Sequence, residues 1–341
     1  MNDPASSFPL PSAHALNVTA DLPIPLWLFA WAALLVLFLS FMLLALSWRK
    51  PVLSETRWLS LGLGFGPRAT GFARATAGAI GVAMLGLTLA AALFGTDSAS
   101  RNFAVTFVFV TVWVGGAVTS AFAGDLLRPF NPWGALARLG ARPARALRRR
   151  PRRRRAVPAR WGRWPAVAGV LAFGWLELVL SPTSTGAILA PRTLGLLVLA
   201  YTVASLSFCA IFGASRWLER GEFVAVYLST FGRLSPWACR DGRVGWRGPM
   251  RGLVGWAAEA PGSVALAVAL IGITTFDGAA EGVLSEPIRA TAEGLTHTGL
   301  GPTWADRAAL SVFLLLSVGF VASIFWLCVA GMGPIRGICP K

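Results

Sequence analysis

Three side chains of this sequence have the types expected of a site that activates water. Glu177 interrupts an apolar stretch, Asp277 ends another, and His297, one of only 2 histidines, follows in the next polar segment. A charged group in an apolar segment is costly and is often functional. Carboxylates with one imidazole suit a divalent metal ion, which activates water for ester hydrolysis. One hypothesis is therefore a catalytic site formed by Glu177, Asp277 and His297, with or without a bound divalent metal ion. This site requires three separate segments to meet.

The two carboxylates also have structural interpretations. Glu177 is predicted near the end of a membrane helix, where its side chain can reach the outer headgroups or form a structural pair. Asp277 precedes Gly278, and this order is typical of a helix end. The sequence has no Walker loop, Rossmann fingerprint, HExxH or GxSxG motif. No known catalytic motif therefore decides between the two interpretations.

The elements that must position these residues are membrane-spanning helices. The sequence is 55% hydrophobic and 13% charged, whereas a soluble domain carries about 25% charged residues. Crossing a bilayer takes about 20 mostly apolar residues, and seven runs qualify or nearly qualify. The sequence predicts an all-α polytopic transmembrane bundle with spans at residues 26–47, 75–95, 103–123, 164–180, 193–214, 262–276 and 309–332.

Three apolar runs are shorter than a full span. The runs 164–180 and 262–276 need help from flanking residues or from local thinning of the bilayer. The run 223–234 is bounded by Glu222 and Arg233 and is too short to span. It is predicted to be an interfacial or re-entrant helix.

The basic residues predict the orientation of the bundle. Arginine carries nearly all of the positive charge, which is typical of a GC-rich bacterial genome. Loops rich in Lys and Arg stay in the cytoplasm. With the N-terminus outside, 27 of the 31 basic residues lie inside and 4 outside. The sequence therefore predicts a multi-pass protein of the bacterial inner membrane, with its N-terminus outside and its C-terminus cytoplasmic.

Residues 1–341 are interpreted as a single integral membrane domain with two distinctive loops. The cytoplasmic loop 126–163 is rich in arginine, and the periplasmic loop 278–306 is acidic, with a helix expected to start near Ser285. Arginines near anionic headgroups contribute about 1 kcal/mol each. Nucleic acid is the less favoured partner, because no aromatic stacking platform or binding motif accompanies the arginines. The lipid bilayer is the expected partner, and nucleic acid is not.

A second polar set is expected on the inner face. Glu219 and Glu222 lie among many arginines, so structural salt bridges are the expected role of both. Pro129 and Pro132 bracket Phe130 and Asn131. This spacing predicts an extended, non-helical connection at the membrane edge.

Several segments together resemble a known family. They are DLLRPFNPWGALARL after the third span, AGVLAFGWLELV in the fourth, WLERGEFVAVYLSTFGRLSP after the fifth and TTFDG at the end of the sixth. These segments, within residues 125–278, resemble bacterial polytopic membrane proteins described as fenitrothion hydrolases, which degrade organophosphates. The resemblance carries no catalytic residues over to this chain.

The resemblance implies a membrane-bound hydrolase, or a hydrolase subunit, that cleaves lipophilic organophosphorus triesters such as fenitrothion. Water would attack phosphorus and release the aryl alcohol. Members of that family continue with further membrane helices beyond the seventh span. A second membrane subunit is therefore one possible partner of this chain. A transporter or permease component, suggested by Glu177 and the short sixth span, is the first alternative. A non-catalytic membrane subunit of a complex is the second.

Overall fold

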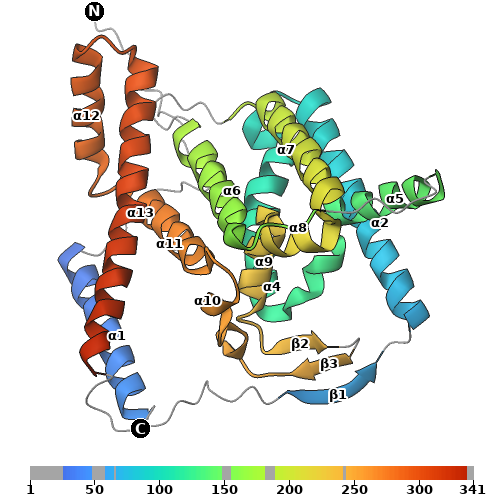
Figure 1. The fold of residues 1–341 in the computed structure, drawn as a ribbon. Coiled ribbons are helices and arrows are strands. Elements are labelled where there is room, and N and C mark those ends of the chain that lie inside the picture. The colour runs from blue at the N-terminus through green and yellow to red at the C-terminus, as the bar shows by residue number, and fades with distance from the viewer. Residues whose placement is uncertain are drawn as a thin grey trace, which may run out of the picture.

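The computed structural model describes residues 26–47, 58–64, 67–147, 155–180, 189–240 and 243–335 (Figure 1). Nearly all of its regular structure is helical, so the predicted all-α transmembrane bundle is confirmed. Within the described residues, six helical segments are long and apolar enough to cross a membrane: Ala69–Phe94, Phe103–Ala123, Ala159–Leu180, Pro191–Phe212, Ser263–Ala280 and Pro302–Gly331.

The main helices and strands follow one another along the chain with short connections. The first half of the chain contains α1 (Leu26–Ser47), β1 (Leu59–Gly64), α2 (Pro67–Phe94), α3 (Phe103–Val105), α4 (Gly116–Ala123), α5 (Pro132–Leu147) and α6 (Trp164–Trp175). The second half contains α7 (Pro191–Phe212), α8 (Ala214–Arg220), α9 (Phe223–Gly232), β2 (Trp237–Arg240), β3 (Arg243–Trp246), α10 (Trp256–Glu259), α11 (Ser263–Ala280), α12 (Ser285–His297) and α13 (Pro302–Ile335).

Two of the spans are interrupted by π-helical segments. The stretch η2 (Thr106–Gly115) joins α3 to α4, and η5 (Leu176–Leu180) continues α6. A π turn widens the helix and is found most often at functional sites. The stretch η2 has no fully buried residue, and η5 contains Glu177.

The short fourth and sixth spans gain length from their flanks, as the sequence analysis requires. A 3₁₀ turn, η4 (Ala159–Trp161), extends the fourth span to Ala159–Leu180, which has 22 residues. The sixth span is α11, which runs four residues past the predicted end and reaches 18 residues. At about 1.5 Å per residue, these spans are about 33 and 27 Å long, close to the thickness of the hydrocarbon core.

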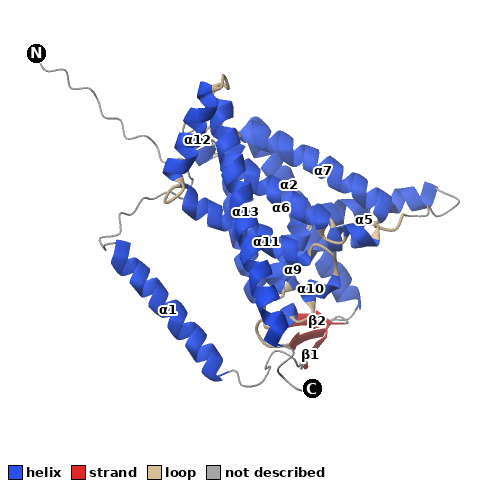
Figure 2. Cartoon of the chain, turned by 60° about the vertical axis from the view of Figure 1, so that its left-hand side comes forward, coloured by secondary structure: helices blue, strands red, loops and turns tan. Residues whose placement is uncertain are grey.

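A three-stranded sheet joins segments that are far apart in the sequence. Strand β3 is central, and both β1 and β2 pair with it antiparallel, with Leu59 and Trp237 both opposite Trp246. The sheet places the connection before α2 beside the connection that follows α9. Figure 2 shows the sheet at one end of the bundle and α12 toward the other. This arrangement agrees with the predicted alternation of the spans, in which both strand-bearing connections lie on the same side.

The core lies where α6, α9, α11 and α13 meet. Its most buried side chains include Val170, Val226, Leu266 and Phe276. Small residues let these helices approach closely, as in other membrane bundles. A Cβ atom at Gly272 would lie 2.7 Å from the Cα of Val318 on α13, so this helix crossing excludes any larger side chain.

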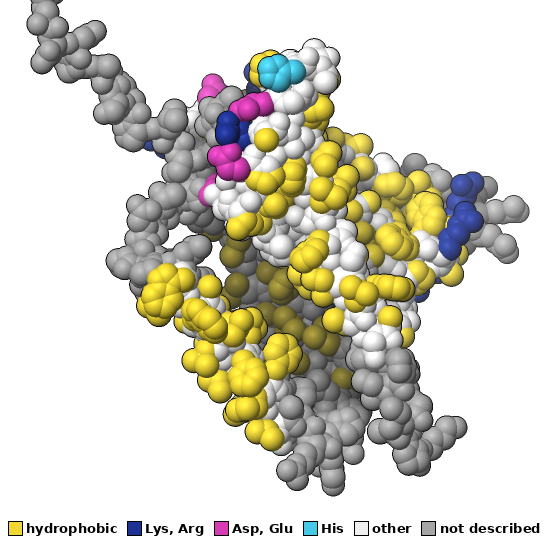
Figure 3. Space-filling model, turned by 90° about the vertical axis from the view of Figure 1, so that its left-hand side faces the viewer, with side chains coloured by type: hydrophobic (Ala, Val, Ile, Leu, Met, Phe, Trp, Pro, Cys, Tyr) yellow, Lys and Arg dark blue, Asp and Glu magenta, His cyan; other side chains and the backbone are white. Residues whose placement is uncertain are grey.

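The outer flank of the bundle is apolar and suits contact with lipid. Every described side chain of α1 is exposed. On α13, Phe320 is 61% exposed and Leu327 is 60% exposed. Figure 3 shows apolar side chains spread over this flank, with acidic side chains gathered toward one end. Contiguous apolar surface of this extent would be unfavourable in water. The chain is therefore a multi-pass membrane protein whose apolar helices face the bilayer.

Two sequence-based expectations need revision. Phe130 is not in an extended connection: it ends a 3₁₀ helix, η3 (Asp125–Phe130), and only Asn131 is extended. The prolines do not prevent this, because Pro132 occupies the first position of α5, where its missing N–H is not needed. The helix α5 also occupies part of the arginine-rich loop, while the run of arginines at 148–154 lies outside the described residues.

Candidate functional site

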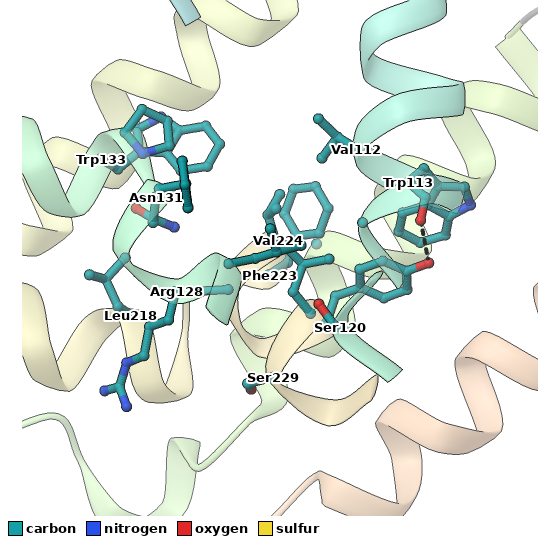
Figure 4. A pocket seen from close by; sticks show the side chains of 18 of the residues that line it. Val112, Trp113, Ser120, Arg128, Asn131, Trp133, Leu218, Phe223, Val224 and Ser229 are labelled. Atoms are coloured by element: carbon teal, nitrogen blue, oxygen red, sulfur yellow. Dashed lines mark hydrogen bonds between the residues drawn. The ribbon is translucent and has the colours of Figure 1, made fainter. Parts of the chain in front are cut away.

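A cavity of about 850 Å³ lies among α2, η2, α4, α6, α7 and α9. Its walls are mostly apolar, and its volume falls within the range of about 300–1,000 Å³ typical of small-molecule sites. In Figure 4, Asn131 and Trp133 lie on one side and Val112 and Trp113 on the other, with Phe223 between them. The cavity is therefore enclosed by both π-helical η2 and the short helix α9.

Six aromatic rings follow one another around the cavity wall. Each ring lies within 6 Å of the next, centroid to centroid, and the closest pair is Trp113 and Tyr227, stacked at 4.1 Å with an interplanar angle of 7°. In order, the rings are Trp133, Tyr201, Phe223, Phe173, Trp113 and Tyr227. Aromatic pairs in such offset or edge-on geometry add about 0.5–1.5 kcal/mol each beyond burial. The wall is therefore both rigid and suited to a flat lipophilic ligand.

A fully buried carboxylate supports this wall from behind. Glu222 has no exposed surface and accepts four hydrogen bonds. The Tyr201 hydroxyl and the Asn131 amide donate to it, the latter at 2.9 Å, and the backbone N–H groups of Val224 and Ala225 donate at 3.0 and 2.8 Å. Tyr201 and Asn131 themselves line the cavity. Glu222 therefore fixes two polar groups of the wall and does not itself face the cavity.

The position of Glu222 follows from local sequence. It precedes the apolar run Phe223–Gly232 and accepts from the second and third N–H groups of α9, so it is the N-cap of that helix. Asn131 caps α5 in the same way, accepting from the N–H of Gly134 at 2.8 Å. Burial raises the pKa of the Glu222 carboxyl above its usual range, while its four hydrogen bonds act in the opposite direction. The sequence-based assignment of Glu222 to a salt bridge with arginine is therefore wrong.

At the strand-bearing side, the cavity is lined by charged residues that we call the basic rim. The rim contains Arg128, Arg163, Arg220, Arg233, Arg247, Glu219 and Glu259. Its five arginines and two glutamates give the rim a formal charge of +3. A low-dielectric wall beside a surplus of one sign focuses the field and attracts counter-ions.

The rim charges form two groups. The Arg128 guanidinium donates to Glu219 at 2.8 Å, and both side chains are more than half exposed. In the second group, Glu259 accepts two hydrogen bonds from Arg233, at 2.6 and 2.7 Å, and one from Arg163 at 2.8 Å. Arg163 is only 9% exposed and also donates to the Ser263 hydroxyl at 2.6 Å. The expected salt bridge of Glu219 is thus present.

The three residues first suggested for catalysis are only partly brought together. Glu177 and Asp277 are close enough for their carboxylates to interact electrostatically, and Glu177 also interacts with Tyr227 of the cavity wall. Glu177 does not itself line the cavity, although its neighbour Leu176 does. The pair therefore lies behind the wall, next to the η2 and α9 aromatics.

His297 does not complete a metal site with that pair. It is the last residue of α12, and the helical rise of about 1.5 Å per residue places it about 18 Å along the axis from Ser285. Among the described residues, no group of three or more His, Cys, Asp and Glu side chains could hold a metal ion. The hypothetical cluster of Glu177, Asp277 and His297 therefore does not form there as a set of metal ligands.

Sequence reasoning missed the polar support of the cavity wall. Tyr201 is one of only 2 tyrosines, but it lies inside an apolar run and resembles an ordinary core residue. Glu222 carried a usable signal, because an acidic or polar residue directly before an apolar run is a candidate N-cap. The link from Glu222 to Asn131 spans 91 positions, and no local pattern predicts it.

No protein-family model, curated protein or solved structure matches this chain. Its function is therefore inferred from the cavity and its charges. The aromatic section has the size and apolar lining to accommodate a flat lipophilic molecule, and two arginine-held carboxylates, Glu219 and Glu259, line the same cavity. These groups can orient a polar substituent and accept a proton from water.

Proposed function

We propose that this chain is a membrane-bound hydrolase, or a subunit of one, that cleaves lipophilic organophosphorus triesters with an aryl leaving group. The observation that carries the proposal is the aromatic cavity of about 850 Å³ inside a lipid-facing bundle. Its six aromatic rings suit the aryl group, and a lipophilic ester partitions readily into the surrounding bilayer. The resemblance of residues 125–278 to fenitrothion hydrolases suggests the reaction.

The proposed reaction is attack of water at phosphorus. The new bond joins the water oxygen to phosphorus, the bond from phosphorus to the aryl oxygen breaks, and the aryl oxide leaves. The proton of water passes to a carboxylate, for which Glu219 and Glu259 are the candidates that line the cavity. Arginine side chains near phosphorus stabilise the negative charge that develops on its oxygens.

A hydrolysis assay on membranes from cells that express this chain alone tests the proposal. Fenitrothion should yield a yellow nitrophenolate, and the chelator EDTA shows whether a divalent metal ion is needed. A Val112→Trp variant fills the cavity, whereas Val114→Trp adds the same side chain outside it, at a position that is 46% exposed and does not line the cavity. Activity should be lost only in Val112→Trp.

Two results would count against the hydrolase. Membranes without activity, when the protein is present in folded form, would mean that it is not a hydrolase by itself. Equal activity in Val112→Trp and Val114→Trp would remove the cavity from the reaction. Activity that appears only when a second membrane chain is co-expressed would instead identify this chain as a subunit.

Transport is the second candidate function, and one observation favours it. The helix α9 is only 10 residues long and packs against α4 and α6 inside the bundle, beside the cavity. Interrupted helices next to a central site are typical of transporters. Uptake of a lipophilic substrate into proteoliposomes, without formation of product, would support transport over hydrolysis.

The proposed location is the bacterial inner membrane, with the N-terminus outside. The support is the distribution of basic residues, of which 27 of 31 fall on the side that contains β1, β2 and β3 when the predicted spans are used. In this orientation the basic rim faces the cytoplasm, and α12 faces the periplasm.

A further inference from the structure

The rim carries a surplus of positive charge, and a bound neutral triester has no formal charge to pair with it. Glu219 compensates Arg128, and Glu259 is shared between Arg163 and Arg233. The rim residues and the six aromatic rings line the same cavity. A ligand that matched both sections would have an apolar body and an anionic head.

Arg220 is the rim residue best placed to bind such a head. It is exposed and lines the cavity, and it makes no ion pair with the residues that the structure describes. It lies within electrostatic reach of Arg163, so two like charges face the same space. An anion between them would relieve their repulsion.

We infer that the basic rim binds the anionic head of an amphipathic molecule, such as the phosphate monoester of a lipophilic alcohol, whose apolar body occupies the aromatic cavity. Guanidinium groups bind phosphate oxygens through charge-assisted hydrogen bonds, in a geometry that a planar fork favours. The inference rests on the cavity as the binding site of the proposed function, but it does not require hydrolysis.

The inference also gives the basic rim a role in a hydrolase, which is the release of products. Cleavage of a neutral triester produces two anions, a phosphate diester and an aryl oxide. Both products are amphipathic and suit the rim better than the substrate does. The rim is thus placed to draw products from the aromatic section toward the aqueous side.

Calorimetric titration of the purified chain in phosphatidylcholine nanodiscs tests the inference. The probes are octyl phosphate below its critical micelle concentration, octyl glucoside as a neutral amphiphile with the same tail, and inorganic phosphate. We expect octyl phosphate to bind at least about tenfold more tightly than either control, because one charge-assisted hydrogen bond corresponds to about that factor.

The matched variants are Arg220→Gln and Arg216→Gln. Both remove one positive charge from an exposed position of α8, but only Arg220 lines the cavity. Arg220→Gln should weaken octyl phosphate binding about tenfold, and Arg216→Gln should leave it within about twofold, because exposed charges are screened by salt.

Each outcome of the titration decides the inference. Equal affinity for octyl phosphate and octyl glucoside, equal effects of the two variants, or binding of inorganic phosphate as tight as that of octyl phosphate would overturn it. Nanodiscs that contain phosphatidylglycerol identify the natural source, since weaker octyl phosphate binding there means that a lipid headgroup occupies the rim. Arg220-dependent binding in a chain without hydrolase activity would refute the proposed reaction and keep the anion site.

Discussion

The side chains of Asn131 and Glu222 cap two different helices and are hydrogen-bonded to each other at 2.9 Å. Asn131 accepts from the first turn of α5, and Glu222 accepts from the first turn of α9. The carboxylate thus lies directly at the positive end of the α9 dipole and is linked to the start of α5 through the Asn131 amide. This contact holds the start of α9 against the connection that precedes α5, and residues of both segments line the cavity.

Replacement of Glu222 by Gln should destabilise the fold. Each carboxylate oxygen accepts two hydrogen bonds, so the amide nitrogen of Gln would face two donors. Loss of two buried hydrogen bonds to a charged group should lower the free energy of unfolding by about 3 kcal/mol. Unfolding in mixed micelles measures the change, with exposed Glu219→Gln as the control. A change below about 1 kcal/mol in Glu222→Gln would refute the capping role.

The stability contributed by Glu222 should fall as pH rises. Burial raises its pKa in the folded protein above the value of about 4.3 in the unfolded chain. Between these two values the folded state binds more protons, so the contribution is full below the unfolded pKa and is lost as pH passes the folded pKa. The melting-temperature difference between wild type and Glu222→Gln should narrow from pH 4 to pH 8. A difference that widens would show that the four hydrogen bonds outweigh burial.

Loss of Glu259 should cost more stability than loss of Glu219. Glu259→Ala leaves the Arg163 side chain, which is 9% exposed, without its counter-charge. The free energy of unfolding should fall by about 2–3 kcal/mol. This is less than for a fully buried pair, because Glu259 is 39% exposed. Glu219→Ala breaks an ion pair whose side chains are 60% and 57% exposed and should cost less than about 1 kcal/mol. The two free energies of unfolding provide the test, and equal losses would contradict the burial argument.

The pair Glu177 and Asp277 should influence catalysis only indirectly, through the cavity wall. The double variant Glu177→Gln and Asp277→Asn removes the carboxylate that interacts with Tyr227 and the carboxylate beside it, and neither residue lines the cavity. Hydrolysis should fall less than about tenfold, whereas loss of a group that transfers a proton usually costs 10²–10⁴-fold. A loss in that larger range would restore the pair as the catalytic centre, while activity equal to wild type would remove it.

The orientation of the bundle can be tested with cysteine labelling. Cys239 is exposed on β2, and in a variant that retains only this cysteine, a membrane-impermeant maleimide should label it only after the cells are opened. In a cysteine-free background, Gly294→Cys on α12 should be labelled in intact cells, since a Cβ atom there meets nothing within 4 Å. The reverse pattern would invert the topology.

The sequence was sufficient for six of the seven predicted spans, because their signal is local and strong. The predicted span at 26–47 is a helix, but in the described residues only its shorter apolar part Ala30–Leu43 stands out. Apolar runs near 20 residues predicted the helices, and Ser285 predicted the start of α12. The strands were missed because Leu59–Gly64 pairs with Arg243–Trp246, and neither is long or alternating enough to be recognised alone. Asp277 was predicted to end the sixth span, but α11 continues through it to Ala280.

The candidate site was harder to predict, because its parts are distant in the sequence. Tyr201, Asn131 and Glu222 come from α7, the start of α5 and the start of α9. Asn131 was predicted to lie in an extended connection and Glu222 to form a salt bridge, and no role was predicted for Tyr201. Sequence alone placed Glu222 directly before the apolar run 223–234, but only the packing of the bundle shows that it contacts Tyr201 and Asn131.

The pairing of β1 with β3 has a consequence for the assembly of the protein. Strand β1 is synthesised about 180 residues before β3, which at 5–20 residues per second corresponds to roughly 10–40 s of translation. During this interval four spans enter the membrane while β1 has no strand to pair with. The hairpin of β2 and β3 forms locally, and β1 then adds to its free edge, so closure of the sheet follows insertion of α7 and links the first half of the chain to the second.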